Sequence, residues 1–392
     1  MLSKLKQIFT IEVDYSNRVY GFDIMRGVGI LIVLYAHGRS KMHFFPIFND
    51  FVSVLGFWLM DLFFVLSGFL IGMILIKLYE KEQSFTLTTA YNFWIRRWFR
   101  TLPNYYLVLI ITAILWSLGG KIMFLKLQFL ANLFFCQTIA TPPPFFMEES
   151  WTLCIEEWFY LLFPIFLLVI HRLCKVDLLH GKHIKRNMLL GIFLFFVLST
   201  MLRVALYTVD SKLTWLDMTR MSFFRLDTIA FGIFAAWINF YYPEVFKKYR
   251  NVFGVVFMVS IIIYFIYFYT AIMPGIREQR SLQFFPIASI TFFLLLSGLA
   301  SLSLTVYMKE VKMNKVTIFS RFITMISLIS YSIYIFHRSV VAFIIDKVYT
   351  PSTDLENIVL FAIYFVGSIL ISILVYKYFE YPMTALREKM KK

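Results

Sequence analysis

The feature that most limits the fold of this chain is a series of apolar stretches, each about as long as a bilayer is thick. A helix needs roughly 20 apolar residues to cross the hydrocarbon core. Hydrophobic residues make up 60% of the 392 residues, and 16% are charged. We therefore predict an all-α polytopic membrane protein with about ten transmembrane helices. The predicted spans are 21–38, 51–76, 103–118, 151–170, 188–207, 223–240, 252–273, 284–307, 323–346 and 357–379.

Another apolar segment, 122–139, is interrupted by polar residues, so we expect an interfacial or re-entrant piece ahead of the prolines at 142–144. The layout divides the chain into an N-terminal tail (1–20), one membrane domain (21–380) and a basic C-terminal tail (381–392). The chemistry of the protein must then lie in the membrane or on short loops.

The lysines and arginines alternate between the two sides of this ten-helix layout. Four of the 38 lie inside predicted spans, 25 fall on the side of the N-terminal tail, and nine fall on the other side. Short cytoplasmic loops carry an excess of these residues, so both termini are predicted in the cytoplasm. The net charge of +15 then reflects topology and contact with anionic lipid, and it does not indicate nucleic-acid binding.

Ionisable residues inside the predicted spans indicate a polar passage. Arg26 and His37 lie eleven positions apart on the first span, which puts them on one helix face about 16 Å apart along the axis. Arginine is rare in hydrocarbon unless it has a partner or a polar cavity. Arg26 is predicted in the inner half of the membrane. The residues predicted in the outer half of the membrane are His37, Asp61, Glu156, Glu157, Arg225, Asp227, His337 and Arg338.

A basic cytoplasmic segment follows the second span. Arg96 and Arg100 share a helix face, with Arg97 beside them, and guanidinium groups can bind phosphate oxygens through two parallel hydrogen bonds. From these residues alone, two interpretations stay open. The membrane charges form structural ion pairs, or they line a substrate or proton pathway, as in a proton-coupled transporter.

Several stretches resemble, in order along the chain, the motifs of the acyltransferase 3 family of integral-membrane acyltransferases. These stretches are Gly21–Gly27 with His37, Asp61–Ile71, Arg96–Pro103, Ser150–Tyr160, Arg225–Gly232, Ser330–His337 and Glu380–Pro382. The chain departs from the family pattern at Thr152 and Cys154, where serines are usual, and at Trp158, where glutamine is frequent. It also departs at Arg338, where an apolar residue is more usual.

The resemblance implies a membrane O-acyltransferase of the bacterial cytoplasmic (inner) membrane. Such an enzyme moves an acyl group, most often acetyl, from cytoplasmic acetyl-CoA or another acyl-CoA to a hydroxyl of a carbohydrate. The acceptor is a surface polysaccharide or a lipid-linked or exported glycan. No metal is expected, and we expect the stand-alone form of the family, without its soluble C-terminal domain. The resemblance leaves the acceptor and the oligomeric state open, and a proton-coupled transporter is the alternative.

The resemblance also implies a catalytic group. Hydroxyl attack on a thioester requires removal of the hydroxyl proton, so we expect His37 to be the general base. Glu156 or Asp61 is expected to orient its other ring nitrogen. Arg26 is expected to position the donor or to stabilise the developing charge.

The remaining motif residues are expected to bind substrates or support the site. We assign the coenzyme phosphates to Arg96, Arg97 and Arg100. The acceptor side or its supporting network is assigned to Ser67, Glu157, Arg225, Asp227 and His337. Direct transfer is favoured over an acyl-enzyme on Ser67, because Ser67 and Gly68 could equally form a close helix-packing pair.

Overall fold

The computed structural model describes residues 10–11, 13–16, 18–119, 122–139, 146–174, 182–209, 215–274 and 287–389. The prolines at 142–144 and parts of both predicted tails lie outside these residues. Within the described ranges the protein consists of helices and their connections, without a strand.

Nine helical stretches of the described part are long and apolar enough to cross a membrane. The prediction of an all-α polytopic membrane protein is therefore confirmed. The helices concerned are α2 (Tyr20–Gly38), α3 (Pro46–Glu82), α4 (Leu87–Leu118), α6 (Trp151–Leu173), α7 (Lys182–Val209), α11 (Arg250–Tyr267), α13 (Ile287–Lys309), α14 (Ile318–Phe336) and α16 (Asp354–Val375).

The predicted span 223–240 forms a shorter helix, α9 (Leu226–Tyr241), of 16 residues. At 1.5 Å per residue it is about 24 Å long. It packs against α3 and α7, and most of its residues are buried. Each of the ten predicted spans thus contains a helix, but α9 lies inside the bundle and is shorter than the hydrocarbon core is thick.

The segment 122–139 contains α5 (Ile122–Leu133), which is too short to cross a bilayer, as an interfacial or re-entrant piece requires. Two tyrosines of α4 fasten its end. Tyr105 donates a hydrogen bond of 2.8 Å to the carbonyl oxygen of Asn132, and Tyr106 donates one of 3.2 Å to that of Leu133.

Shorter elements connect these helices or extend them. They are the 3₁₀ helices η1 (Arg39–Met42), η2 (Glu148–Ser150) and η3 (Ser222–Phe224), the π-helices η4 (Phe268–Ile272), η6 (His337–Ala342) and η7 (Tyr376–Glu380), and the helices α8 (Trp215–Arg220), α10 (Pro243–Lys248), α15 (Phe343–Val348) and α17 (Tyr381–Lys389).

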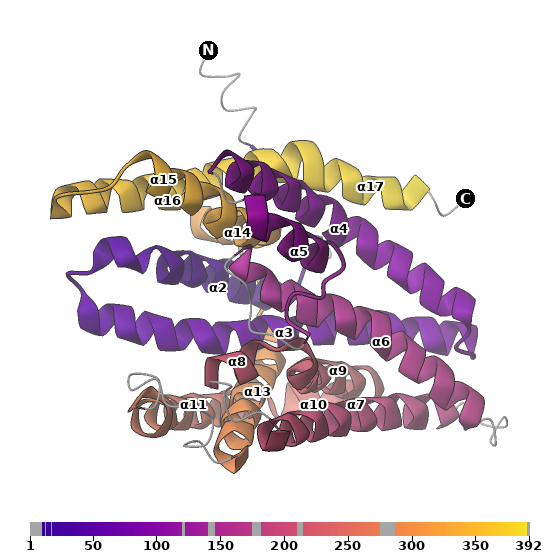
Figure 1. Ribbon diagram of the computed structural model, residues 1–392. Coiled ribbons are helices and arrows are strands. Elements are labelled where there is room, and N and C mark those ends of the chain that lie inside the picture. Colours follow the sequence, from indigo (N-terminus) through magenta and orange to yellow (C-terminus); the bar gives the residue numbers. More distant parts are fainter. Residues whose placement is uncertain are drawn as a thin grey trace.

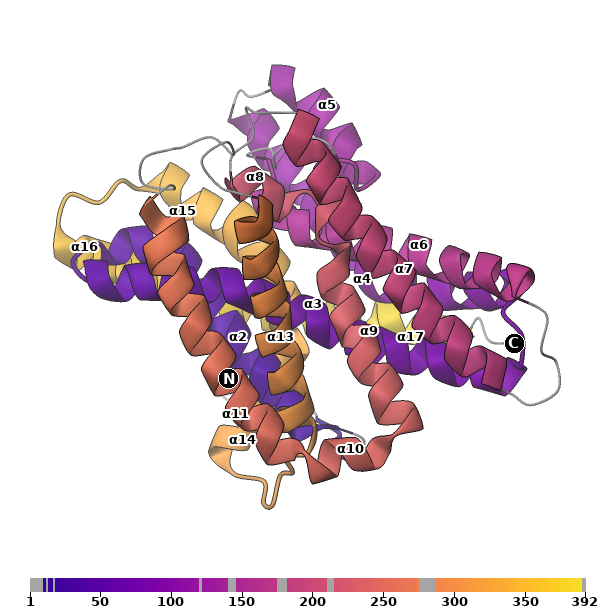
Figure 2. The ribbon, with the colours of Figure 1, turned by 90° about the horizontal axis from the view of Figure 1, so that it is seen from below.

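The helices form a bundle whose middle consists of α2, α3 and α6 (Figure 1). One side of this middle is covered by α4 and α14 to α17, and the other by α7, α9, α11 and α13, which Figure 2 shows from below. The connections α2–α3 and α15–α16 lie at the left end of the bundle in Figure 1, and α3–α4 lies at the right end. Successive long helices therefore cross the bundle in opposite directions.

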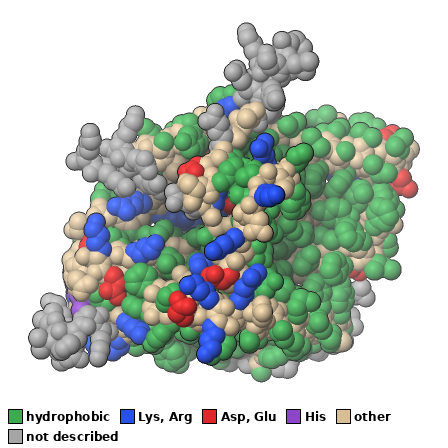
Figure 3. Space-filling view, turned by 180° about the vertical axis from the view of Figure 1, so that it is seen from behind, with side chains coloured by type: hydrophobic (Ala, Val, Ile, Leu, Met, Phe, Trp, Pro, Cys, Tyr) green, Lys and Arg blue, Asp and Glu red, His purple; other side chains and the backbone are tan. Residues whose placement is uncertain are grey.

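The outer surface of the bundle divides into a charged part and an apolar part. Figure 3 shows lysine and arginine side chains gathered over one half of the rear face, together with acidic ones, whereas hydrophobic side chains cover the other half. The charged half lies toward the end that carries the α3–α4 connection. The sidedness of the protein in the membrane stays a prediction from the lysine and arginine count.

Small residues allow α3 and α9 to touch through their backbones. A Cβ atom added to Gly232 would overlap the carbonyl oxygen of Val65, and one added to Gly68 would overlap that of Ile229. Side-chain volume is therefore excluded on both helices at this crossing. The close contact fixes the separation of α3 and α9 at this crossing.

Candidate active site

Two adjoining cavities lie between α2, α3, α6 and α14. The larger, about 550 Å³, is lined by His37 and is called the His37 cavity. The smaller, about 150 Å³, is lined by Arg26 and is called the Arg26 cavity. Met60 and Tyr334 line both, so they mark the junction. The structure thus places His37 and Arg26 in two neighbouring cavities, and a continuous passage between them stays a prediction.

A third pocket continues the series on the far side of the Arg26 cavity. It has a volume of about 190 Å³ and lies between α3 and α4, with Arg96, Arg97 and Arg100 in its wall. Arg97 and Arg100 also line the Arg26 cavity. The three arginines that we predict to bind phosphate thus line a pocket that shares two wall residues with the Arg26 cavity.

His37 is paired with a second histidine, which comes from the end of α14. Its Nδ1 lies 2.6 Å from Nε2 of His337, and the two ring planes are 14° apart. Nδ1 of His337 lies 3.0 Å from the carbonyl oxygen of Ile333, which can only accept a hydrogen bond. In a neutral His337 ring the proton is therefore on Nδ1, and Nε2 accepts a hydrogen bond from Nδ1 of His37. This assigns the free lone pair of His37 to Nε2.

The backbone around His337 departs from the regular α-helix. The residue is fully buried and begins the π-helix η6. Single π-helical turns inside helices are frequent at functional sites, because the extra residue per turn changes where side chains point. Here the irregular turn sets His337 against His37 and brings Arg338 and Ser339 to the His37 cavity.

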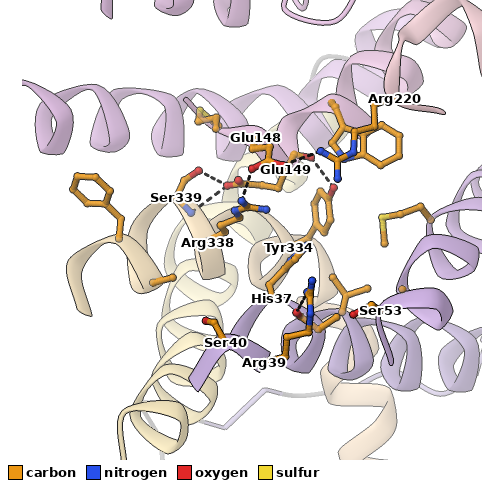
Figure 4. Close-up of a pocket in the computed structure, with 18 of the residues that line it drawn as sticks. His37, Arg39, Ser40, Ser53, Glu148, Glu149, Arg220, Tyr334, Arg338 and Ser339 are labelled. Atoms are coloured by element: carbon orange, nitrogen blue, oxygen red, sulfur yellow. Dashed lines mark hydrogen bonds and ion pairs between the residues drawn. The ribbon is translucent and has the colours of Figure 1, made fainter. Parts of the chain in front are cut away.

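Charged residues surround His37 at its end of the passage (Figure 4). Glu148 accepts a hydrogen bond of 2.8 Å from Arg220 and also binds Arg338. Its neighbour Glu149 is buried and accepts from the backbone N–H of Ser339 at 3.2 Å and from the hydroxyl of the same residue. Both glutamates lie in η2, the short 3₁₀ helix that directly precedes α6, so the start of α6 fixes their position.

Arg26 faces its cavity beside other cations. The carboxylate one turn before it, Asp23, is taken by Arg18 at 2.8 Å and by the hydroxyl of Ser327 at 2.8 Å. Arg97 and Arg100 line the same cavity. The cavity therefore carries a surplus of positive charge that favours an anionic ligand.

The acidic residue of the Arg26 cavity is held by neighbours on three helices. Glu156 accepts hydrogen bonds from Ser67 at 2.8 Å and from Tyr160 at 3.0 Å. Arg97 donates to the Tyr160 hydroxyl at 2.6 Å and lies over its ring. The next residue, Glu157, accepts from Thr101 at 2.8 Å. Ser67, Glu156 and Glu157 thus form part of a network that positions α4 and its arginines.

The expectation that Glu156 or Asp61 orients the ring of His37 is corrected. Neither Glu156 nor Asp61 contacts its ring; the partner of His37 is His337. Asp61 is buried, binds Arg225, and accepts a hydrogen bond from Ser297, so its carboxylate is occupied within the bundle.

Other buried charges hold the bundle together away from the two cavities. Arg203 binds Asp227 and donates to the carbonyl oxygen of Phe224 at 2.6 Å. Arg225, Asp227 and Asp61 line neither cavity. These residues form ion pairs inside the bundle, and their role toward the acceptor stays a prediction.

The departures from the family motif have structural counterparts. Thr152 keeps the hydroxyl that serine would supply, and its oxygen lies 2.6 Å from the hydroxyl of Tyr334, which also donates to the backbone of Glu149. Cys154 and Trp158 both donate to the carbonyl oxygen of Phe135, which lies in the turn after α5, each at 2.7 Å. They fasten this turn to α6.

Sequence reasoning missed several residues of the His37 cavity, namely Arg39, Glu148, Glu149, Arg220, Tyr334 and Ser339. Most lie in loops or at helix ends, where hydropathy gives no signal. Tyr334 lies in one recognised motif and Glu149 lies next to another, so their positions relative to these motifs were the signal that could have identified them.

Residues 19–377 match the family described as an acyltransferase domain. The chain belongs to the acyltransferase 3 family. It is 33% identical over 172 residues to the peptidoglycan O-acetyltransferase OatA of Listeria monocytogenes, a match that covers 40% of this chain and 25% of the relative. A candidate O-acetyltransferase of Staphylococcus aureus is 27% identical over 378 residues, or 87% of this chain and 55% of the relative.

A candidate peptidoglycan O-acetyltransferase of Bacillus subtilis, YrhL, is 30% identical over 174 residues, which is 40% of this chain and 25% of the relative. The matches extend over a quarter to just over half of the length of these relatives. No solved structure matches the chain.

Proposed function

We propose that the protein is an integral-membrane O-acyltransferase that moves an acetyl group from acetyl-CoA to a carbohydrate hydroxyl of the cell envelope. Membership in the acyltransferase 3 family and the names of its relatives support this assignment. The observation that carries it is the meeting of a basic cavity and a histidine-containing cavity at Met60 and Tyr334. We assign the protein to the bacterial cytoplasmic membrane.

The donor would enter from the arginine-rich end. Arg96, Arg97 and Arg100 line the third pocket and offer guanidinium groups for the phosphates of coenzyme A. Arg97 and Arg100 also line the cavity that contains Arg26. Arg26 and His37 line different cavities, so we assign Arg26 to positioning of the donor. The reacting thioester carbonyl would lie at the junction of the two cavities, beside Met60 and Tyr334. The acyl group would then reach the junction through the Arg26 cavity.

The acceptor hydroxyl would occupy the His37 cavity. Nε2 of His37 takes the hydroxyl proton while the hydroxyl oxygen bonds to the thioester carbonyl carbon. The tetrahedral intermediate collapses, the carbon–sulfur bond breaks, and the coenzyme leaves as a thiolate. The imidazolium then returns the proton to sulfur, which yields the ester and free coenzyme A. His337 holds the ring of His37 and its tautomer during both proton transfers.

The direct route needs no acyl-enzyme. The hydroxyl of Ser67, the side chain considered for such an intermediate, donates to Glu156, and a carboxylate is a weaker base than imidazole for a serine hydroxyl. Purified enzyme incubated with labelled acetyl-CoA alone should therefore retain no covalent label after denaturation.

The test uses the purified full chain in nanodiscs with radiolabelled acetyl-CoA and de-O-acetylated cell-envelope glycan. The wild type should label the glycan, and His37→Ala should lower the rate at least a hundredfold, because a general base contributes about 10² to 10⁴. His43→Ala is the matched control. His43 follows the same helix but is exposed and pairs with Asp354 outside both cavities.

The outcomes separate the enzyme from the transporter. Label in the glycan that depends on His37 and not on His43 supports the proposal. If the wild type ignores acetyl-CoA and instead moves a solute together with protons in vesicles, the acyltransferase assignment is wrong.

A further inference from the structure

The His37 cavity contains more cationic groups than proton transfer from a neutral hydroxyl requires. Arg39, Arg220 and Arg338 line it, from η1, α8 and η6, which are far apart in the sequence (Figure 4). Guanidinium groups are costly to gather in one place unless anions offset them. The carboxylates of the same cavity therefore decide how much positive charge is left over.

Each carboxylate of the cavity has partners of its own. Glu148 is shared by Arg220 and Arg338, so one negative charge serves two positive ones. Glu149 is buried and turned to Ser339. Asp346 is paired with Lys41, which is not part of the cavity wall.

Arg39 lies two residues beyond His37 and is exposed to the cavity. Its Nη1 donates 2.5 Å to the carbonyl oxygen of Ala36, and in the described part of the chain no carboxylate forms an ion pair with it. The negative charge of Asp50 also acts on it. Arg338 keeps 41% of its side chain exposed while bound to Glu148. Both guanidinium groups thus have donors left for a ligand.

We propose that the acceptor is an acidic glycan, and that Arg39 with Arg338 binds an anionic group close to the hydroxyl that is acetylated. This inference rests on the proposed function and names its acceptor class. A carboxylate or a phosphate accepts two parallel hydrogen bonds from one guanidinium, which fixes both the position and the orientation of the sugar. Arg39 is close enough in sequence to His37 for the bound anion and the reacting hydroxyl to belong to the same or neighbouring sugar residues.

The experiment measures acetyl transfer to three forms of one cell-envelope glycan with purified full-length protein in nanodiscs. The first form is de-O-acetylated only. In the second, the carboxylates are also converted to amides with a carbodiimide and an excess of a neutral-product amine such as methylamine. In the third, phosphoryl groups are removed with cold hydrofluoric acid. We expect KM for the acceptor to rise about tenfold, equivalent to about 1.4 kcal/mol, in the form that has lost the recognised anion. The second and third forms distinguish a carboxylate from a phosphate.

Charge-matched variants connect this dependence to Arg39. The ratio of KM between the neutralised and the native glycan should fall toward one in Arg39→Gln, which leaves only Arg338 to bind the anion. Arg39→Lys keeps the charge but cannot form two parallel hydrogen bonds, so its ratio should lie between those of Arg39→Gln and the wild type. Lys347→Gln, which removes an exposed cation of α15 outside the cavity wall, is the control and should keep the wild-type ratio.

Three results would each overturn a different part of this account. A wild-type enzyme that acetylates all three forms with equal KM overturns the acidic acceptor while the proposed function stands. An unchanged ratio in Arg39→Gln overturns the role of Arg39. Absence of transfer to any form, with active protein shown by acetyl-CoA binding, overturns the proposed function itself.

Discussion

Replacing His337 by alanine tests the contact on which the assignment of Nε2 as the catalytic nitrogen depends. The substitution removes the 2.6 Å hydrogen bond to Nδ1 of His37 and frees the His37 ring to rotate and to change tautomer. A neutral hydrogen bond contributes about 0.5–1.5 kcal/mol, and loss of tautomer control adds to it. We expect kcat to fall about 10- to 100-fold, or about 1.4–2.8 kcal/mol. His37→Ala should cost more, because it removes the base itself.

Two further variants separate positioning from packing. The end of a glutamine side chain can reach the place of Nε2 and accept a hydrogen bond from His37, whereas the shorter asparagine reaches only the place of Nδ1. His337→Gln should therefore recover part of the lost kcat, and His337→Asn should resemble alanine. The assay is steady-state acetyl transfer at saturating acetyl-CoA, with kcat and both KM values measured separately. KM for acetyl-CoA should change less than threefold, because His337 does not line the Arg26 cavity.

The reasoning fails if His337→Ala keeps the wild-type kcat. It fails equally if His337→Gln lowers kcat as much as His337→Ala does while the protein stays monodisperse. Melting temperature in detergent and size-exclusion profiles supply that check on folding.

Three other substitutions test the remaining contacts. Arg100→Ala should raise KM for acetyl-CoA far more than KM for the acceptor, and equal effects on both would remove the phosphate site. Asp61→Asn should destabilise the protein by about 3–5 kcal/mol, because buried Arg225 loses its carboxylate partner. The double variant Asp61→Leu with Arg225→Leu should recover much of this loss, measured by thermal unfolding. If it recovers nothing, the pair does more than balance charge. Gly232→Ala should force α3 and α9 apart and lower the melting temperature, at a cost of about 1–3 kcal/mol; an unchanged melting temperature would contradict the close crossing.

The membrane fold could be predicted from the sequence because hydrocarbon imposes length and composition on each span separately. The one helix that departs, α9, is shorter than the rule requires because its neighbours α3 and α7 enclose it. Burial by protein relaxes the length requirement, and hydropathy along one chain does not reveal which spans are enclosed.

The site could be predicted in part. Arg26 and His37 line two neighbouring cavities because both lie on one face of one helix, where spacing fixes direction. The partner of His37 lies 300 residues away on another helix, and nothing in the spacing within either helix indicates that the two rings meet. The same holds for Asp61, which has Arg225 as its partner, 164 residues away, rather than His37. Contacts between helices depend on packing, which the pattern of a single sequence does not encode.

The most direct test of the central claim is a structure of the His37→Ala variant with acetyl-CoA bound, determined in a nanodisc. We predict the coenzyme phosphates at Arg96, Arg97 and Arg100, the pantetheine arm along the Arg26 cavity, and the acetyl carbonyl at Tyr334, open to the His37 cavity. An acceptor hydroxyl placed in that cavity would then come within about 3–3.5 Å of the carbonyl carbon. Coenzyme bound elsewhere, or an acetyl group closed off from the His37 cavity, would contradict this account.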